Sequence, residues 1–220
     1  WQIKKMNKFF NQELILRLVS AFVFIPLVIL PLIYSNYVSL LVYILITSII
    51  CYEIIEIKLK VKNSYIFYFY LIFIVVAFFF FLFLLICEEY SFITIMMIIS
   101  IIWLFDTFSF LGGKIIGGKK LMPKISSGKT FSGLATGIFM TLIITEILLY
   151  SLNLTFQLSF LFTLSIIFLS FSGDTIVSMI KRYASIKDSG KIMPGHGGLL
   201  DRFDSFIAVF FVYGIANLVI

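Results

Sequence analysis

The amino-acid sequence predicts an all-α, polytopic integral membrane protein with about seven transmembrane helices, forming one domain over residues 1–220. Three observations support this fold class. Hydrophobic residues make up 61% of the chain and charged residues 13%, whereas soluble domains are about 45–50% apolar and about 25% charged. Long runs such as Tyr65–Cys87 carry no charge. The basic residues fall before or at the start of the first run, or between alternate pairs of the later runs, as segments on one side of a membrane would.

Each predicted span is an apolar run near the length of about 17–25 residues that crosses roughly 30 Å of hydrocarbon. The spans are residues 14–33, 37–57, 65–87, 91–111, 132–151, 157–177 and 205–220. The last would be a helix of only about 24 Å, at about 1.5 Å per residue, and is therefore marginal. The first is too long for a cleavable signal peptide. Because the chain starts at Trp1, we expect some native sequence to precede it.

The 17 lysines and arginines set the predicted orientation. With the N-terminus in the cytoplasm, all of them lie on the cytoplasmic side, and the opposite connections YSNY, EEY and SLNLTFQ contain none. Cytoplasmic loops are enriched in Lys and Arg. The net charge of +6 is therefore explained by membrane topology, and we expect no nucleic-acid partner.

Polar residues concentrate around the end of the sixth predicted span. Asp174, Ser178 and Lys181 are spaced i, i+4, i+7 and share one helical face. Asp174 lies near the inner edge of the membrane, where an ionisable residue is costly unless it is paired or faces a wet cavity. A functional role is the favoured interpretation. The alternative is a helix-end salt bridge with Lys181 and Arg182.

The segment KDSGKIMPGHGGLLDRFD, Lys187–Asp204, follows directly. Its glycines let the backbone approach a ligand closely, and successive N–H groups in such a turn can bind an anion. Asp201 and Asp204, at i, i+3, can hold Mg²⁺ and leave positions for water and phosphate, although Asp204 is also suited to capping the last helix. His196 can be a nucleophile, a general base or a hydrogen-bond donor to phosphate, and we favour the donor. Basic residues nearby would bind the remaining phosphate charge.

A second polar cluster follows the fourth span, in FDTFSFLGGKIIGGKKLMPKISSGKTFSG. We expect Asp106, near the cytoplasmic end of that span, to join the same wet cavity. SSGKT resembles the end of a phosphate-binding P-loop, but Pro123 stands where the first glycine of that motif belongs, so the P-loop interpretation fails. The other lysines of the loop are equally well explained as topological charges. Glu53 and Glu56, near the inner end of the second span, are expected to reach the interface.

The stretch Ser178–Asp204 resembles the signature of phosphatidate cytidylyltransferases, also called CDP-diacylglycerol synthases. That pattern reads S-x-x-K-R, four residues, K-D, then H-G-G and D-R-x-D. The upstream loop also resembles this family's segment, except that Ser127 replaces a usual proline and Ser132 a usual glutamate. The resemblance covers roughly Asp106 to the C-terminus, so residues 106–204 would be the catalytic portion and the helices within 14–87 a hydrophobic scaffold.

The resemblance implies that CTP and phosphatidate react to give CDP-diacylglycerol and pyrophosphate. It further implies a bacterial inner-membrane protein, commonly a homodimer, with its site facing the cytoplasm and with Mg²⁺, beside which a second cation can bind. Residues expected at the site are Lys181, Arg182, Lys187, Asp188, His196 and Arg202 in catalysis, Ser178, Lys129, Gly197 and Gly198 in nucleotide binding, and Asp174, Asp201 and Asp204 at the metal.

Three other functions are weighed against this one. A CTP-dependent lipid kinase would release CDP in place of pyrophosphate. An ion-coupled transporter would carry its charges near the bilayer midplane, whereas these cluster at the cytoplasmic edge. The D-G-x-x-A-R pattern of CDP-alcohol phosphotransferases does not occur in the sequence.

Overall fold

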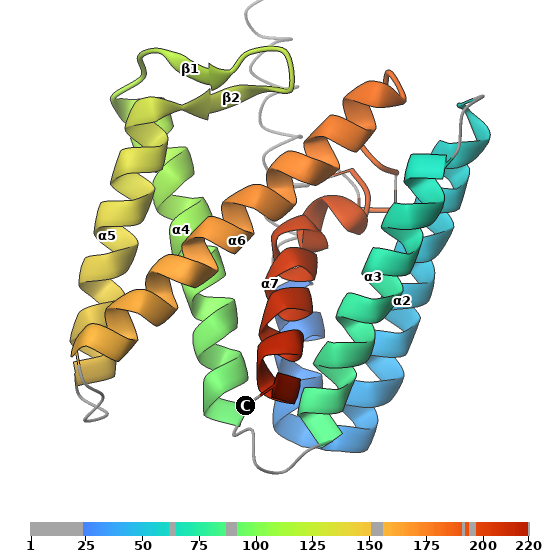
Figure 1. The fold of residues 1–220 in the computed structure, drawn as a ribbon, viewed down its shortest axis with the longest axis horizontal. Coiled ribbons are helices and arrows are strands. Elements are labelled where there is room, and N and C mark those ends of the chain that lie inside the picture. The colour runs from blue at the N-terminus through green and yellow to red at the C-terminus, as the bar shows by residue number, and fades with distance from the viewer. Residues whose placement is uncertain are drawn as a thin grey trace, which may run out of the picture.

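Helices and one small β-hairpin make up the computed structural model, which describes residues 24–61, 65–86, 92–150, 156–190, 192–193 and 197–219 (Figure 1). The helices are α2 (Asn36–Leu59), α3 (Tyr65–Ile86), α4 (Phe92–Ile115), α5 (Phe131–Tyr150), α6 (Phe156–Tyr183) and α7 (Leu200–Val219), and a shorter helix, Phe24–Tyr34, precedes α2. The fold is thus that of a polytopic helical membrane protein.

Within the described part of the chain, five helices are long and apolar enough to cross a membrane, namely α2, α3, α4, α5 and α6. Each lies within a few residues of a predicted span, and the protein is an integral membrane protein. α6 continues to Tyr183, beyond the predicted end of its span at residue 177, and so carries Ser178 and Lys181. The span predicted at 205–220 is a helix that already begins at Leu200. Of the span predicted at 14–33, residues 14–23 lie outside the described residues.

The helices form two groups joined by α6 and α7 (Figure 1). α4 packs against α5, α2 packs against α3, and α7 lies between α6 and α3. Where α6 crosses α7, a Cβ on Gly173 would lie 2.5 Å from the carbonyl oxygen of Asp204. Glycine at this position therefore permits a close approach, which brings the neighbouring Asp174 to the first turns of α7.

Aromatic side chains anchor the first half of α7 in the apolar core. The ring of Phe203 is 2% exposed and contacts the rings of Phe24, Phe78 and Phe206. Further along, the rings of Phe210 and Phe81 lie 4.3 Å apart between their centroids. Because rings of this size dominate core energetics, these contacts fix how α7 is oriented against α3.

The loop between α4 and α5 forms a two-stranded antiparallel hairpin, β1 (Lys120–Met122) and β2 (Ser126–Thr130). This short hairpin is an addition to the all-α fold that the sequence predicts. Gly117 and Gly118 have φ values of 67° and 102°, a conformation that ends α4 and that side chains rarely adopt. The chain then crosses the end of the bundle, and pairing two short strands satisfies backbone groups that no helix can satisfy there.

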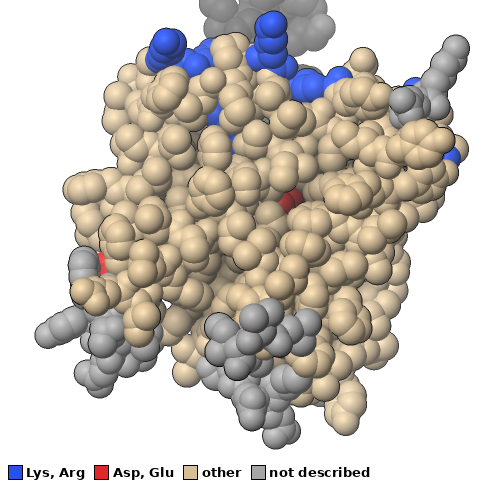
Figure 2. Space-filling model, in the orientation of Figure 1, with Lys and Arg blue, Asp and Glu red and all other residues tan. Residues whose placement is uncertain are grey.

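Lysine and arginine side chains gather at the end of the molecule that carries the hairpin, whereas the broad middle surface is mostly uncharged (Figure 2). This one-sided arrangement agrees with the charge segregation predicted from the sequence. We call this end of the molecule the basic end. The hairpin, the C-terminal end of α6 and the start of α7 lie toward it (Figure 1).

Candidate active site

Two ion pairs lie at the basic end among the described residues. In the first, Nζ of Lys129 in β2 and Oδ2 of Asp174 in α6 are 2.9 Å apart. The ammonium group also donates to Thr175 Oγ1 at 3.1 Å and lies 4.4 Å from the ring centroid of Phe171. Three residues of α6 thus hold one lysine of the hairpin. The helix-end salt bridge considered for Asp174 is wrong, because its partner comes from β2.

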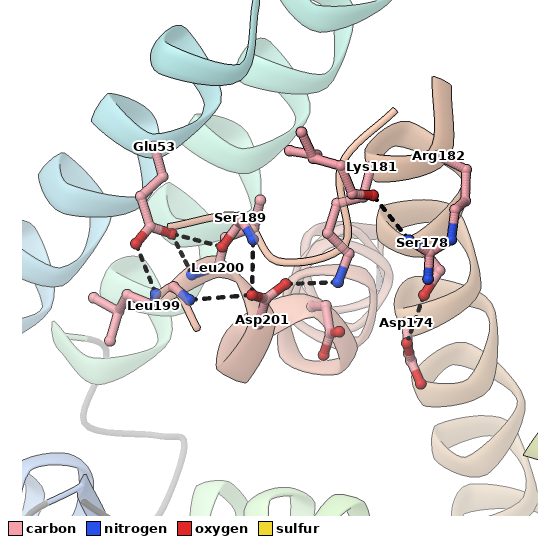
Figure 3. A network of polar contacts seen from close by, with 12 residues as sticks. Glu53, Asp174, Ser178, Lys181, Arg182, Ser189, Leu199, Leu200 and Asp201 are labelled. Atoms are coloured by element: carbon pink, nitrogen blue, oxygen red, sulfur yellow. Dashed lines mark hydrogen bonds and ion pairs between the residues drawn. The ribbon is translucent and has the colours of Figure 1, made fainter. Parts of the chain in front are cut away.

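The face of α6 predicted from the i, i+4 spacing is confirmed in part. Ser178 Oγ donates to Asp174 Oδ1 at 3.2 Å. Lys181 turns away from both and reaches α7 (Figure 3). Arg182 donates instead to backbone carbonyls, from Nε to Ile125 at 2.9 Å and from Nη1 to Ile186 at 2.9 Å. Arg182 therefore ties the hairpin to the loop that follows α6.

The second ion pair joins Lys181 Nζ and Asp201 Oδ1 at 2.6 Å, and the two side chains are only 11% and 10% exposed. The other carboxylate oxygen of Asp201, Oδ2, accepts from the backbone N–H of Ser189 at 2.9 Å and of Gly198 at 3.1 Å (Figure 3). Both oxygens of Asp201 are thus engaged within the protein. Gly197 beside them has φ 87°, which explains why a glycine stands there.

Three carboxylates from three helices lie near one another at the site. Asp106 of α4, Asp174 of α6 and Asp204 of α7 are close enough to interact electrostatically. Arg202 and Lys129 act on Asp106 with the opposite sign. Oδ1 of Asp204 also accepts from the N–H of Ser205 at 2.8 Å. The expectation that Asp106 joins the same cavity is confirmed for Asp174, which lines one cavity together with Asp106.

A magnesium ion fits this set of carboxylates only if water or substrate phosphate supplies its remaining ligands. Among the described residues, no three His, Cys, Asp or Glu side chains converge closely enough to enclose a metal. Mg²⁺, however, is usually held by one or two carboxylates and keeps water or substrate phosphate in its remaining positions. The carboxylates of Asp174, Asp201 and Asp204 are therefore compatible with a shared protein and substrate site.

A cavity of about 380 Å³ opens between α4, α5, α6 and the hairpin. Asp106, Lys129 and Asp174 line it together with apolar residues such as Phe110 and Leu134. An apolar groove between α5 and α6 shares Leu134 and Phe171 with this cavity. The cavity thus offers charged groups and hydrocarbon surface to the same ligand.

The remaining predicted site residues lie in the loop that follows α6 or outside the described residues. Lys187 and Asp188 are exposed in the loop after α6. Asp188 nevertheless packs close to Gly197, since a Cβ added to Gly197 would lie 3.2 Å from the Cβ of Asp188. His196 lies outside the described residues, and its role stays a prediction.

Sequence reasoning missed Glu53. It is 1% exposed and accepts hydrogen bonds from the loop before α7 and from α7 itself, so the expectation that it reaches the interface is wrong. Glu56, in contrast, is exposed and accepts from the hydroxyl of Tyr52, so its place at the interface stays a prediction. The signal for Glu53 was present, since an ionisable residue in an apolar span indicates a polar partner.

The fold and the site together define an integral membrane protein with paired lysines and carboxylates beside an amphiphilic cavity at one end of its helices. The chain belongs to the cytidylyltransferase family, whose model matches residues 2–219.

Three relatives illustrate the similarity. A phosphatidate cytidylyltransferase of Staphylococcus aureus (strain COL) is 44% identical over 111 residues, which cover 50% of this chain and 43% of the relative. One of Rickettsia bellii (strain RML369-C) is 41% identical over 133 residues, covering 55% and 58%. One of Staphylococcus haemolyticus (strain JCSC1435) is 40% identical over 111 residues, covering 50% and 43%. The chain spans about half the length of these curated relatives.

Proposed function

We propose that this protein transfers CMP from CTP to phosphatidate, giving CDP-diacylglycerol and pyrophosphate. The observation that carries the proposal is the Lys129–Asp174 ion pair in the lining of a cavity that is both charged and apolar. The same helix, α6, also supplies Lys181 to the second ion pair, with Asp201. Membership of the cytidylyltransferase family and relatives named phosphatidate cytidylyltransferase support the same reaction.

The chemistry needs charge neutralisation and positioning more than a strong base. The phosphate monoester of phosphatidate is already anionic, and it must approach the α-phosphorus of a triphosphate that is also anionic. Lys129, Lys181 and Arg202 would screen this repulsion, since charge-assisted contacts to phosphate are among the stronger hydrogen bonds in proteins. Alignment of the attacking oxygen with the leaving pyrophosphate then dominates the rate enhancement.

Mg²⁺ is the proposed cofactor, with a second cation beside it. When bound, the metal would neutralise the charge of the triphosphate and of the leaving pyrophosphate. One or two of the carboxylates of Asp174, Asp201 and Asp204 would hold it, with water and substrate phosphate in its other positions. Each of the first two is now paired with a lysine, and we propose that the lysine moves to a phosphate oxygen when the substrate binds. Ser178 would keep Asp174 oriented during this exchange.

The proposed orientation has seven spans and the active site at the cytoplasmic face of a bacterial inner membrane, where CTP is available. It is supported by the gathering of Lys and Arg at the end that carries the site (Figure 2). Phosphatidate would then present its phosphate at the same interface, with its acyl chains toward the apolar groove between α5 and α6. A homodimer is a further expectation, which size measurement in detergent would test.

Product analysis tests the proposal directly. The purified protein in vesicles that contain phosphatidate and the lipid alcohol diacylglycerol, supplied with CTP and Mg²⁺, should form CDP-diacylglycerol and pyrophosphate in equal amounts. Formation of CDP in place of pyrophosphate would identify a lipid kinase. A folded protein that yields neither product would refute the proposal.

A further inference from the structure

We propose that Glu53 of α2 is a positioning residue for the active site. It holds the loop before α7, and the first turn of α7, in the geometry that presents Asp201. The inference rests on the proposed function, because Asp201 is there a residue of the reaction centre. It assigns an active-site task to a helix that otherwise looks like hydrophobic scaffold.

The carboxylate of Glu53 accepts three hydrogen bonds from donors outside its own helix. Oε1 accepts from the N–H of Leu199 at 2.8 Å, and Oε2 accepts from the N–H of Leu200 at 2.9 Å and from Ser189 Oγ at 3.0 Å (Figure 3). The side chain is 1% exposed. A buried charge is tolerated only when it is well paired. Glu53 therefore needs these three donors in place.

Glu53 supplies what the local sequence lacks at the start of α7. The carbonyl of Leu199 accepts from the N–H groups of Arg202 and Phe203, so Leu199 is the N-cap, the residue just before the helix. That position usually holds Ser, Thr, Asn or Asp, whose side chain accepts from the first unpaired N–H groups. Leucine cannot do this. The carboxylate of a distant helix instead accepts from two other N–H groups at this terminus, those of Leu199 and Leu200, and its negative charge suits a helix N-terminus.

Ser189 connects Glu53 to the reaction centre. Its hydroxyl donates to Glu53, and its backbone N–H donates to Asp201, which also holds Lys181 (Figure 3). A continuous path of polar contacts therefore runs from α2 through the loop to α7 and α6. Displacing Glu53 would shift the N–H groups that orient Asp201.

Two glycines of the loop are explained by the same carboxylate. A Cβ on Gly190 would lie 2.6 Å from Glu53 Oε1, and a Cβ on Gly198 would meet Ser189 Oγ first and lie 2.5 Å from Glu53 Oε2. Neither distance is tolerable for real atoms. The glycines thus make room for a protein carboxylate, a demand separate from any need to bring the backbone close to phosphate.

Glu53→Gln is the sharpest substitution because it keeps the shape and changes the donor pattern. One oxygen becomes an NH₂ group, which must then face either Leu199 N–H or Leu200 N–H, donor against donor. Small displacements at an active site can cost about 100-fold in rate, and we expect kcat to fall about 10- to 100-fold. Hydrogen exchange at the amides of Ser189, Gly198, Leu199 and Leu200 should accelerate, and the Mg²⁺ concentration for half-maximal rate should rise.

Glu56→Gln is the matched control, since Glu56 lies one turn further along α2 and is exposed. It should leave kcat, Mg²⁺ dependence and loop exchange unchanged. The proposal is overturned if Glu53→Gln behaves like this control. It is also overturned if Glu53→Gln lowers the melting temperature and speeds exchange throughout α2, α3 and α7 while kcat per folded molecule stays normal.

Two further variants keep the test decisive if Glu53→Gln does not fold. Ser189→Ala removes one bond to Glu53 but keeps the N–H that binds Asp201, and should give the same changes at smaller amplitude. Gly190→Ala should impair the native protein yet add little to Glu53→Ala, in which the clashing carboxylate is gone. The proposal would be contradicted if the losses of kcat in Gly190→Ala and Glu53→Ala were additive in the double variant. It would also be contradicted if Ser189→Ala changed neither kcat nor amide exchange. A native protein without cytidylyltransferase activity would refute the proposed function separately, since the exchange measurements stand without it.

Discussion

Replacing Asp201 with Asn should lower both stability and turnover, whereas Asp174→Asn should lower turnover with little loss of stability. The difference follows from burial. The side chains of Lys181 and Asp201 are 11% and 10% exposed, and removing one partner of a buried ion pair costs about 3–5 kcal/mol because a charge is left uncompensated. The side chains of Lys129 and Asp174 are 18% and 33% exposed. Solvent screening limits the cost there to about 1 kcal/mol or less.

Turnover should fall about 100-fold or more for each variant, the size of loss that follows removal of one preorganised electrostatic contact. For Asp201→Asn the loss includes misorientation of the loop, because Oδ2 holds the N–H groups of both Ser189 and Gly198. The assay combines detergent-solubilised unfolding with kcat across a Mg²⁺ titration. The double variant Lys181→Met with Asp201→Asn is the control. It should recover stability, since no buried charge is left unpaired, but not turnover.

Two results would refute this reasoning. If Asp201→Asn unfolds like the native protein, the Lys181–Asp201 pair is not the buried contact described. If well-folded Asp201→Asn turns over normally at limiting Mg²⁺, Asp201 has no part in the reaction and Asp174 remains as the main acidic candidate.

Three further predictions concern the hairpin and the topology. Lys129→Ala should reduce kcat far more than Lys119→Ala, since Lys129 pairs with Asp174 and Lys119 is exposed at the end of the bundle; equal small losses would make the hairpin a topological signal only. Arg182→Ala should speed amide exchange in the hairpin because its bond to Ile125 is lost, and unchanged exchange would contradict that tie. In a background without the two native cysteines, cysteines replacing Lys60, Lys119 or Arg202 should react with impermeant reagents from the cytoplasmic side only, and labelling of any one from the opposite side would overturn the orientation.

Much of the fold could be predicted from sequence because a helix that crosses hydrocarbon must have a minimum length and an apolar composition. The spans that became α2 to α6 were located within a few residues for that reason. Local spacing likewise predicted the contact between Ser178 and Asp174. The hairpin was not predicted, because its strands are short and it depends on how the chain crosses the end of the bundle.

The pairing within the site could not be predicted, since each partner is far away in sequence. Lys181 shares a helical face with Asp174 yet bonds to Asp201, and Asp174 bonds to Lys129. Nothing local chooses between these carboxylates. The packing of α6 on α7 does, because Gly173 allows the two helices to approach closely. Glu53 was misplaced for a related reason, as its donors follow it by well over 100 residues.

The destination of the CTP phosphorus tests the central claim most directly. The protein is supplied in parallel with CTP labelled at the α- or the γ-phosphate, with Mg²⁺ and with vesicles that contain both phosphatidate and diacylglycerol. Nucleotidyl transfer predicts that the α-label enters lipid, as CDP-diacylglycerol, and that the γ-label leaves as pyrophosphate. Entry of the γ-label into lipid, with release of CDP, would contradict the account.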